Sequence, residues 1–178
     1  KEIEFFSKLK NQWWDVEGPL GLLHKLADVR IEFILKNVLR INPNSNKYSL
    51  NGLKCIDIGC GGGIITERLK RLGANVFGID TSDKAIDVAK DHAKQSRLKI
   101  NYECISTSKY LKKYKNFKFD VVIASEVIEH VYNRQRFLSD ISSLTKDGGI
   151  IAITTLNKTV PSIVFAKFFA EYILKIIP

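Results

Sequence analysis

One glycine-rich stretch constrains the fold of this chain more than any other. Residues 54–58 form a short apolar run, and four of the next five residues are glycine. Glycine stands where the backbone turns sharply or approaches another group closely. Residues 64–72 then place Ile65, Leu69 and Leu72 on one face of a helix. The stretch therefore predicts a buried parallel strand, a tight loop and a helix. Such a loop, at the carboxyl edge of a sheet, is the usual site for a nucleotide-like ligand.

The spacing of these glycines separates two kinds of ligand. A dinucleotide fingerprint, G-x-G-x-x-G/A, needs a small residue where this chain has Ile64. The chain instead has the pattern D-x-G-x-G-x-G, formed by Asp57, Gly59, Gly61 and Gly63. This pattern resembles the first motif of class I S-adenosylmethionine-dependent methyltransferases. Adenosylmethionine carries no phosphate, so bare loop backbone beside a carboxylate suits it. A purely structural glycine turn is the alternative.

A second acidic residue favours the same ligand. The apolar run 74–79 ends at Asp80, 21 residues after Gly59. An acidic residue at about this distance, at the end of the second strand, accepts hydrogen bonds from ribose hydroxyls. Because Ser82 and Asp83 follow closely, Asp80 could instead belong to a helix cap.

The composition describes one globular domain with a positive charge. The 178 residues are 45% hydrophobic and 26% charged, enough for a single domain with a substantial core. The net charge of +9 indicates an anionic partner, either nucleic acid or a membrane surface, although a lysine-rich proteome gives the same excess. The three cysteines form no C-x-x-C pair, which argues against a disulfide framework or a zinc site. Because the chain begins at Lys1 and contains no methionine, we expect a processed or trimmed segment.

The order of apolar and breaker segments predicts a Rossmann-like α/β fold. Strands are expected at 53–58, 75–79, 99–105, 119–125 and 149–155. Helices are expected at 64–72, 82–95, 107–113 and 133–146. This alternation predicts a mostly parallel, doubly wound sheet with right-handed crossovers. Residues 52–157 would form this core, and residues 1–41, with helices at 2–12 and 22–39, an N-terminal helical cap.

Residues 158–178 differ from the rest of the chain. They are mostly apolar, with one narrow polar stripe formed by Lys167, Glu171 and Lys175. These charges interrupt the apolar stretch, so a membrane span is not expected. An amphipathic helix lying in a membrane interface and a helix packed on protein both fit the pattern.

The end of the fourth expected strand carries the candidate chemical groups. Ser125 is followed by Glu126, Glu129 and His130. If a helical turn starts at Glu126, these three side chains share one face and can hold a divalent cation such as magnesium, while His130 also admits zinc or manganese. His130 could instead act as a general base. Helix capping, with Ser125 as the cap, is the structural alternative.

Motifs along nearly the whole chain resemble the ubiquinone biosynthesis O-methyltransferase family, which methylates polyprenylated catechols. The segments that carry the resemblance are Trp13-Trp14-Asp15 with Glu17-Gly18, Leu23-His24 with Val29-Arg30, 57–63, 78–80, 125–131, 154–158 and 171–174. The glycine stretch and Glu-x-x-Glu-His occur in broader groups, whereas Trp-Trp-Asp with its downstream arginine is more selective.

The resemblance implies a role for each matching residue. Adenosylmethionine would be contacted by Arg30, Gly59, Asp80 and Ser125. A magnesium-type ion would be bound by Glu126, Glu129 and His130, with His130 or Glu126 helping to remove the catechol proton. The family has seven strands, so we expect this chain to lack the C-terminal ones.

The resemblance also implies a location and partners. The substrates would be polyprenyl-dihydroxybenzoate and demethylubiquinol, which lie in a membrane. The chain would then dock on an anionic surface, beside other proteins of ubiquinone biosynthesis and without nucleic acid. We expect the matrix side of the mitochondrial inner membrane, with the bacterial cytoplasm or inner-membrane face as the alternative.

Three other functions compete with this interpretation. A nucleic-acid methyltransferase fits the positive charge, but it would carry an Asn/Asp-Pro-Pro-aromatic motif where Ser125-Glu126-Val127-Ile128 stands. A non-enzymatic adenosylmethionine-binding subunit is the second, and another small-molecule methyltransferase is the third. An NAD-dependent oxidoreductase is disfavoured by Ile64.

Overall fold

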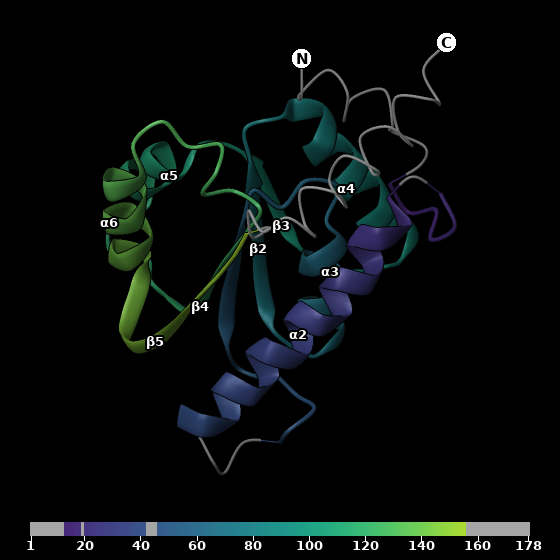
Figure 1. Cartoon of the computed structure of the whole chain (residues 1–178), viewed down its shortest axis with the longest axis horizontal. Coiled ribbons are helices and arrows are strands. Elements are labelled where there is room, and N and C mark those ends of the chain that lie inside the picture. Colours follow the sequence, from purple (N-terminus) through teal and green to yellow (C-terminus); the bar gives the residue numbers. More distant parts are fainter. Residues whose placement is uncertain (1–12, 19, 42–45, 156–178) are drawn as a thin grey trace, which may run out of the picture.

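The computed structural model describes residues 13–18, 20–41 and 46–155 of the chain. The helices are α2 (Gly21–Ile41), α3 (Ile64–Arg71), α4 (Asp83–Gln95), α5 (Thr107–Lys113) and α6 (Arg134–Leu144). The strands are β1 (Lys54–Ile58), β2 (Asn75–Asp80), β3 (Asn101–Cys104), β4 (Phe119–Ser125) and β5 (Thr145–Thr154). Figure 1 shows α2, α3 and α4 on one side of the sheet and α5 and α6 on the other.

The five strands form one parallel sheet in the order β3-β2-β1-β4-β5. The chain moves outward from β1 to β3 and then returns to the other side of β1 with β4. The strand order therefore reverses between β1 and β4, where an open α/β sheet binds its ligand at the carboxyl ends of the strands. The prediction of a doubly wound α/β fold is confirmed.

Alternate residues of the strands build two separate cores, as expected for a sheet that is covered on both faces. In β1, Cys55 belongs to the core under α2 and α3, while Ile56 and Ile58 belong to the core under α5 and α6. In β4, Val121 faces the first core and Val122 the second. Side chains of both cores are almost completely buried, so the sheet is a rigid platform for the loops at its edge.

Strand β5 begins earlier than the sequence suggests. The last strand was expected at 149–155, but β5 already pairs with β4 at Thr145. From Phe119↔Thr145 to Val121↔Ile150 the register shifts, because β5 carries extra residues there. The residues before the expected strand therefore form a bulge within β5. At the other edge, β3 is shorter than the predicted 99–105.

Helix α2 is the described part of the expected N-terminal cap. Its buried residues Ala27, Ile31, Ile34 and Val38 recur at intervals of three and four, which places them on one face. That face contacts α3 and β5. The helices predicted at 2–12 and 158–178 lie outside the described residues. Among the helices that the structure describes, none combines the length and apolar character needed to cross a membrane.

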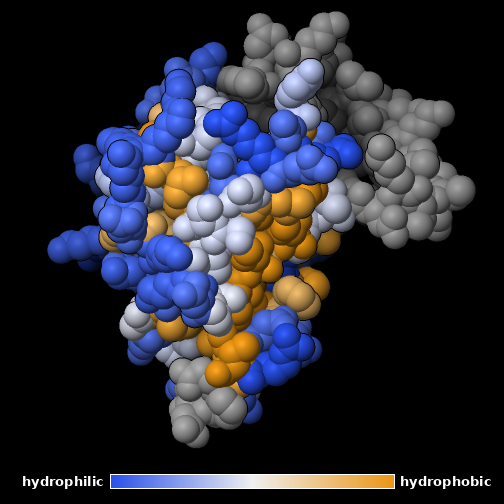
Figure 2. Space-filling model, turned by 90° about the vertical axis from the view of Figure 1, so that its left-hand side faces the viewer, coloured by the Kyte–Doolittle hydropathy of each residue, from blue (hydrophilic) through white to orange (hydrophobic). Residues whose placement is uncertain are grey.

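Strand β5 is one of the two outer strands of the described sheet. Figure 2 shows an apolar band on the side of the molecule where β5 and α6 lie. Ile151 of β5 is 40% exposed.

Candidate functional site

A cavity of about 920 Å³ lies at the carboxyl ends of the strands, where the order of the sheet reverses. Its lining includes most of the residues that the sequence singled out, namely Arg30, Asp57, Gly59, Gly61, Asp80, Ser125, Glu126 and His130. They come from α2 and from the ends of β1, β2 and β4, so folding brings together groups that are up to 100 residues apart in the chain. Gly63 and Glu129 do not line it.

The glycine loop between β1 and α3 forms the floor of this cavity. Gly59 and Gly61 have φ values of 69° and 53°, in the left-handed region that favours glycine. Gly59 N and Cys60 N both donate to Ile79 O, at 2.8 and 3.0 Å, and so tie the loop to the end of β2. A Cβ on Gly59 would lie 2.4 Å from Val127 Cγ2, so the loop after β4 approaches the glycine loop directly.

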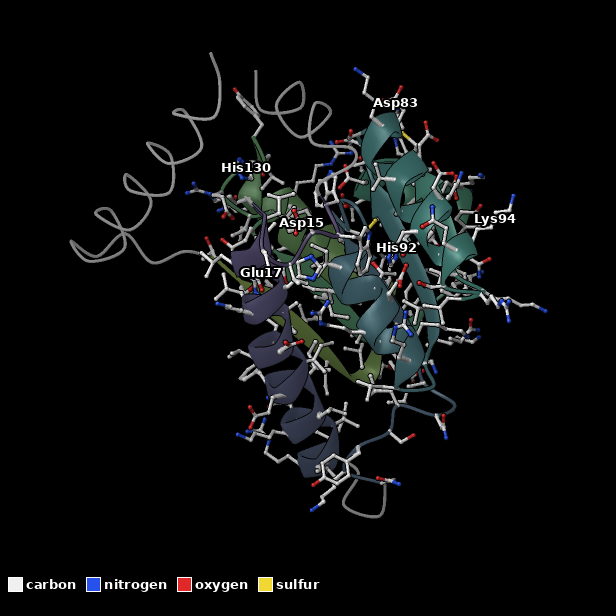
Figure 3. All side chains as sticks on the ribbon, turned by 90° about the vertical axis from the view of Figure 1, so that its right-hand side faces the viewer. Asp15, Glu17, Asp83, His92, Lys94 and His130 are labelled. Carbon is white, nitrogen blue, oxygen red and sulfur yellow. The ribbon has the colours of Figure 1, made fainter. Side chains whose placement is uncertain are left out.

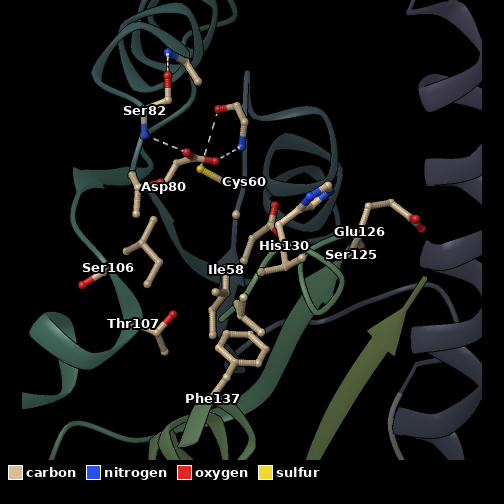
Figure 4. Close-up of a pocket in the computed structure, with 18 of the residues that line it drawn as sticks. Ile58, Cys60, Asp80, Ser82, Ser106, Thr107, Ser125, Glu126, His130 and Phe137 are labelled. Atoms are coloured by element: carbon tan, nitrogen blue, oxygen red, sulfur yellow. Dashed lines mark hydrogen bonds between the residues drawn. The ribbon is translucent and has the colours of Figure 1, made fainter. Parts of the chain in front are cut away.

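Asp80 holds the glycine loop and the start of α4 at the same time. One oxygen, Oδ2, accepts from Gly61 N at 2.9 Å, and the other, Oδ1, accepts from Ser82 N at 2.8 Å (Figure 4). Ser82 in turn caps α4 by accepting from Ala85 N at 3.2 Å. The sequence left open whether Asp80 faces a ligand or belongs to a helix cap. In the structure it lines the cavity and also supports the cap of α4. Each carboxylate oxygen has a second lone pair for a ligand hydroxyl.

Asp57 lies beneath the loop and is only 2% exposed. Its Oδ2 accepts a hydrogen bond from Thr66 Oγ1 at 2.6 Å. Burial raises the pKa of the Asp57 carboxyl from 3.8 to about 7, while the Thr66 hydrogen bond opposes the rise and the nearby Asp80 adds to it. The carboxyl therefore exchanges its proton near neutral pH.

Gly63 has a local structural reason to be glycine. Its φ is 89°, and a Cβ there would lie 2.5 Å from Tyr102 Oη. The residue is the N-cap of α3, and its carbonyl accepts from Glu67 N at 2.9 Å. Its contact with a cofactor stays a prediction.

Trp13 forms a wall of the cavity that the sequence analysis did not identify. Its ring lies against the glycine loop so closely that a Cβ on Gly61 or Gly62 would come within 2.7 Å of it. Trp13 is 6% exposed. The Trp-Trp-Asp motif entered the prediction only as a family signature. The local sequence around Trp13 does not indicate that its ring contacts Gly61, 48 residues later.

The loop after β4 differs from the predicted helical turn. Glu126 has a φ of 55°, a left-handed conformation that helical residues do not adopt, and only a turn follows at 128–130. The prediction that Glu126, Glu129 and His130 share one helical face is therefore wrong. Ser125 is the last residue of β4 and not a helix cap, and its Oγ is buried without a hydrogen-bond partner among the described residues.

Arg30 of α2 reaches across to this loop. Its Nη2 lies 2.5 Å from Glu126 Oε1, and the two side chains are 12% and 23% exposed. A largely buried arginine–carboxylate pair is stronger than a surface pair and fixes both groups. The ion pair therefore sets the position of Glu126 at the edge of the cavity, while His130 lies nearby on the same loop (Figure 4).

The described residues do not fit a preformed metal centre. Glu126 is engaged by Arg30, and the described part of the chain contains no group of three or more His, Cys, Asp or Glu side chains that could hold a metal ion. Glu129 Oε2 is buried and has no hydrogen-bond partner among the described residues. A single such oxygen is an acceptor for a cation but does not make a site.

The opposite wall of the cavity is built from residues that the sequence analysis left out. They follow β3, or they belong to α6 and its N-cap, and they are Ser106, Thr107, Asn133, Arg136, Phe137 and Asp140. The rule that loops after parallel strands border the ligand crevice would have found the first two. No such rule predicts the residues of α6. They border the cavity because that helix packs on β4 and β5, which the local sequence does not indicate.

Comparisons with known proteins agree with this geometry. A family model described as a methyltransferase domain matches residues 56–153. The ubiquinone biosynthesis O-methyltransferase of Pelagibacter ubique is 46% identical, over 100% of this chain and 73% of that protein. The enzyme of the same name from Brucella melitensis biotype 2 is 41% identical, over 99% of this chain and 71% of that protein.

Solved structures show the same fold at lower sequence identity. Magnesium protoporphyrin IX methyltransferase from Synechocystis, with bound SAH, superimposes with a TM-score of 0.58 at 23% identity, over 80% of this chain and 63% of that one. A methyltransferase from Clostridium acetobutylicum gives a TM-score of 0.57 at 21% identity, over 68% of this chain and 47% of that one. The class I methyltransferase fold expected from the glycine motif is confirmed, and the identities above show that the chain belongs to the ubiquinone biosynthesis O-methyltransferase family of S-adenosylmethionine-dependent enzymes.

Proposed function

We propose that this chain transfers the methyl group of S-adenosylmethionine to a catechol hydroxyl of a polyprenylated ubiquinone precursor. The observation that carries the proposal is the single cavity that joins the glycine loop and Asp80 to Ser125, Glu126 and His130. A donor bound over the glycine loop would thus lie beside titratable groups that act on an acceptor. The names and identities of the relatives support the acceptor class, with polyprenyl-dihydroxybenzoate and demethylubiquinol as the two substrates.

The cofactor would be held from two sides. Asp80 has lone pairs for the ribose hydroxyls, Gly59 and Gly61 leave space at the loop, and Asp57 and Gly63 support the loop from beneath. Arg30 is the cation that would meet the carboxylate of the amino acid part, and Ser125 has a buried hydroxyl without a partner among the described residues. The positions of Arg30, Asp80 and Ser125 around the cavity support these assignments.

In the proposed reaction a catechol oxygen attacks the sulfonium methyl. The O–CH₃ bond forms as the S–CH₃ bond breaks, and the sulfonium becomes a neutral thioether. A phenol titrates near pH ~10, so a base is needed at neutral pH. His130 is exposed and lines the cavity, and an imidazole is the side chain that most often serves as a general base, so it would take the phenolic proton. Glu126, fixed by Arg30, would orient the acceptor.

Methyl transfer to a short-chain catechol tests the proposal. The chain is incubated with methyl-labelled S-adenosylmethionine and a prenylated catechol or a catechol without a chain, and the products are identified by mass spectrometry. We expect label on one oxygen of the catechol, with the prenylated compound preferred. Methylation of nucleic acid instead of a catechol would contradict the proposal and favour a nucleic-acid methyltransferase. Binding of the cofactor without methylation of any catechol would also contradict it and favour a non-enzymatic subunit.

Substitutions separate the chemical groups from the cofactor site. We expect H130A to lower kcat by about 10²–10⁴-fold, as for loss of a general base, with little change in the Kd for S-adenosylhomocysteine. Y132A is the matched variant, because Tyr132 follows His130 closely in the chain but is fully exposed and does not line the cavity.

A magnesium-type cation held by Glu126, Glu129 and His130 stays a prediction from the family resemblance. When bound, such a cation lowers the pKa of a catechol hydroxyl. Calorimetric titration of Mg²⁺, in the presence of the catechol, would then show binding heat that E129A abolishes. Turnover that survives a chelator and is equal in wild type and E129A would count against the cation.

We also propose that the enzyme works at an anionic membrane surface. The net charge of +9 and the amphipathic pattern of 158–178 support this, since polyprenylated substrates lie in a bilayer. Binding to cardiolipin-rich vesicles should exceed binding to zwitterionic ones and fall when Phe165, Phe168 and Phe169 are replaced by serine. Equal sedimentation with both vesicles would contradict it. The relatives named above are bacterial, which favours a bacterial inner-membrane face over the mitochondrial one, and contact with other proteins of the pathway stays a prediction.

A further inference from the structure

The aromatic motif at the start of the described chain makes a polar contact with the glycine loop. Trp14 Nε1 donates to Gly62 O at 3.1 Å, across 48 residues of sequence. Trp14 does not line the cavity, so it cannot act by touching the cofactor. It instead holds the carbonyl of a loop whose backbone is built from glycine, the residue with the most conformational freedom to lose.

The ring of Trp14 has its own support. It stacks on the ring of His92, with centroids 3.5 Å apart and planes 5° from parallel. It also makes a T-shaped contact with the ring of His24, with centroids 5.5 Å apart. Figure 3 shows His92 on the side of the molecule that carries the segment with Asp15 and Glu17. The indole is therefore held in one orientation, with its N–H directed at the loop.

A buried carboxylate orients His92 in turn. His92 Nδ1 lies 2.7 Å from Oε1 of Glu67, which is 1% exposed, and the other oxygen of Glu67 lies 3.4 Å from Arg71. A carboxylate only accepts hydrogen bonds, so Nδ1 donates and the plane of the ring is fixed. Because a buried carboxylate is costly without partners, Glu67 needs His92 in this position.

We propose that Trp14 and His92 are positioning residues for the cofactor loop. Glu67 orients His92, the His92 ring orients the Trp14 indole, and the indole N–H holds Gly62 in the conformation that binds the cofactor. Pre-ordering a flexible loop improves affinity because less conformational entropy is lost on binding. This inference rests on the proposed cofactor site, but it concerns cofactor affinity and not methyl transfer.

Calorimetric titration with S-adenosylhomocysteine tests the proposal without a methyl acceptor. W14F keeps an aromatic ring against His92 but lacks the indole N–H that donates to Gly62 O. We therefore expect the Kd for S-adenosylhomocysteine to rise about five- to tenfold. The KM for S-adenosylmethionine should rise in parallel, while kcat and the KM for the catechol stay unchanged. Y48A is the matched control, because Tyr48 is an aromatic residue that is 68% exposed and remote from the loop, and its Kd should match wild type.

A double-mutant cycle separates positioning from a general loss of stability. H92A should also raise the Kd, and because His92 acts through the indole N–H, W14F/H92A should bind no more weakly than W14F alone. A W14F protein that binds S-adenosylhomocysteine as tightly as wild type would overturn the inference, and so would additive effects of the two substitutions. If the wild type binds but does not methylate a catechol, the proposed acceptor is wrong and the inference stands.

Discussion

At the scale of single residues, the Asp57 carboxyl at the cavity has a pKa far above that of a free aspartic acid side chain. It is 2% exposed beneath the glycine loop, and burial raises its pKa to about 7. The folded chain therefore keeps the proton of Asp57 over a pH range in which the unfolded chain has lost it. A carboxyl in that state favours folding at low pH, and this contribution disappears as the pH rises from about 4 to about 7.

The expected result is a pH-dependent difference between wild type and D57N. Asparagine keeps the shape and accepts from Thr66 but does not titrate. Between pH 5 and pH 8 the wild type should lose about 2–3 kcal/mol of unfolding free energy relative to D57N. Urea denaturation at both pH values measures this. D120N is the control, because the ion pair with Lys146 helps to lower the pKa of Asp120, so no such difference arises above pH 5.

At the scale of elements, the glycine loop is shaped by what packs on it as much as by its own turn. Gly61 has a positive φ, but Gly62 does not, so Gly62 is glycine only because the Trp13 ring lies against it. A side chain there would push the aromatic wall away from the cavity. The loop and the N-terminal segment therefore form one unit, although 48 residues separate Trp14 from Gly62.

For G62A we expect a loss of about 1–3 kcal/mol of unfolding free energy, as for overpacking, together with weaker binding of S-adenosylhomocysteine. G52A is the matched substitution, since Gly52 has a φ of 79° but nothing within 4 Å of an added Cβ. It should cost stability through backbone strain alone and leave the Kd unchanged. Equal Kd values for G62A and wild type would show that Trp13 is not held by this contact.

The sequence predicted regular elements well and long-range contacts poorly. Local periodicity placed all five strands and α2 to α6 within a few residues, because each pattern is set by burial on one or both faces. It failed at Glu126, whose left-handed conformation depends on the loops that surround it, and at β5, whose bulge follows from pairing with β4. The wall formed by Trp13 and the ion pair of Arg30 could not be predicted, since each joins residues that only the fold brings together.

At the scale of the whole molecule, α2 links the N-terminal segment to the far side of the cavity. It packs on α3 and β5, and Arg30 pairs with Glu126 across 96 residues of sequence. Arg30 is also the proposed partner of the cofactor carboxylate. One guanidinium would then serve two anions, so binding of the cofactor and the position of Glu126 are coupled.

This coupling predicts opposite effects of two substitutions on cofactor affinity. R30A should raise the Kd for S-adenosylhomocysteine about tenfold, whereas E126Q should lower it, because Glu126 no longer competes for the guanidinium. Calorimetry measures both. Methylthioadenosine lacks the amino acid carboxylate, and its affinity should be the same in wild type, R30A and E126Q. If both substitutions weaken binding of S-adenosylhomocysteine, Arg30 and Glu126 do not compete in this way.

The long-range ion pair between Arg30 and Glu126 also has a consequence for the order of events on the ribosome. Synthesis adds about 5–20 residues per second, so Glu126 is made roughly 5–20 s after Arg30. During that interval Arg30 has been synthesised, but the loop that carries its partner Glu126 has not. Arg30 therefore reaches this native contact only after all the residues between it and Glu126 have been made.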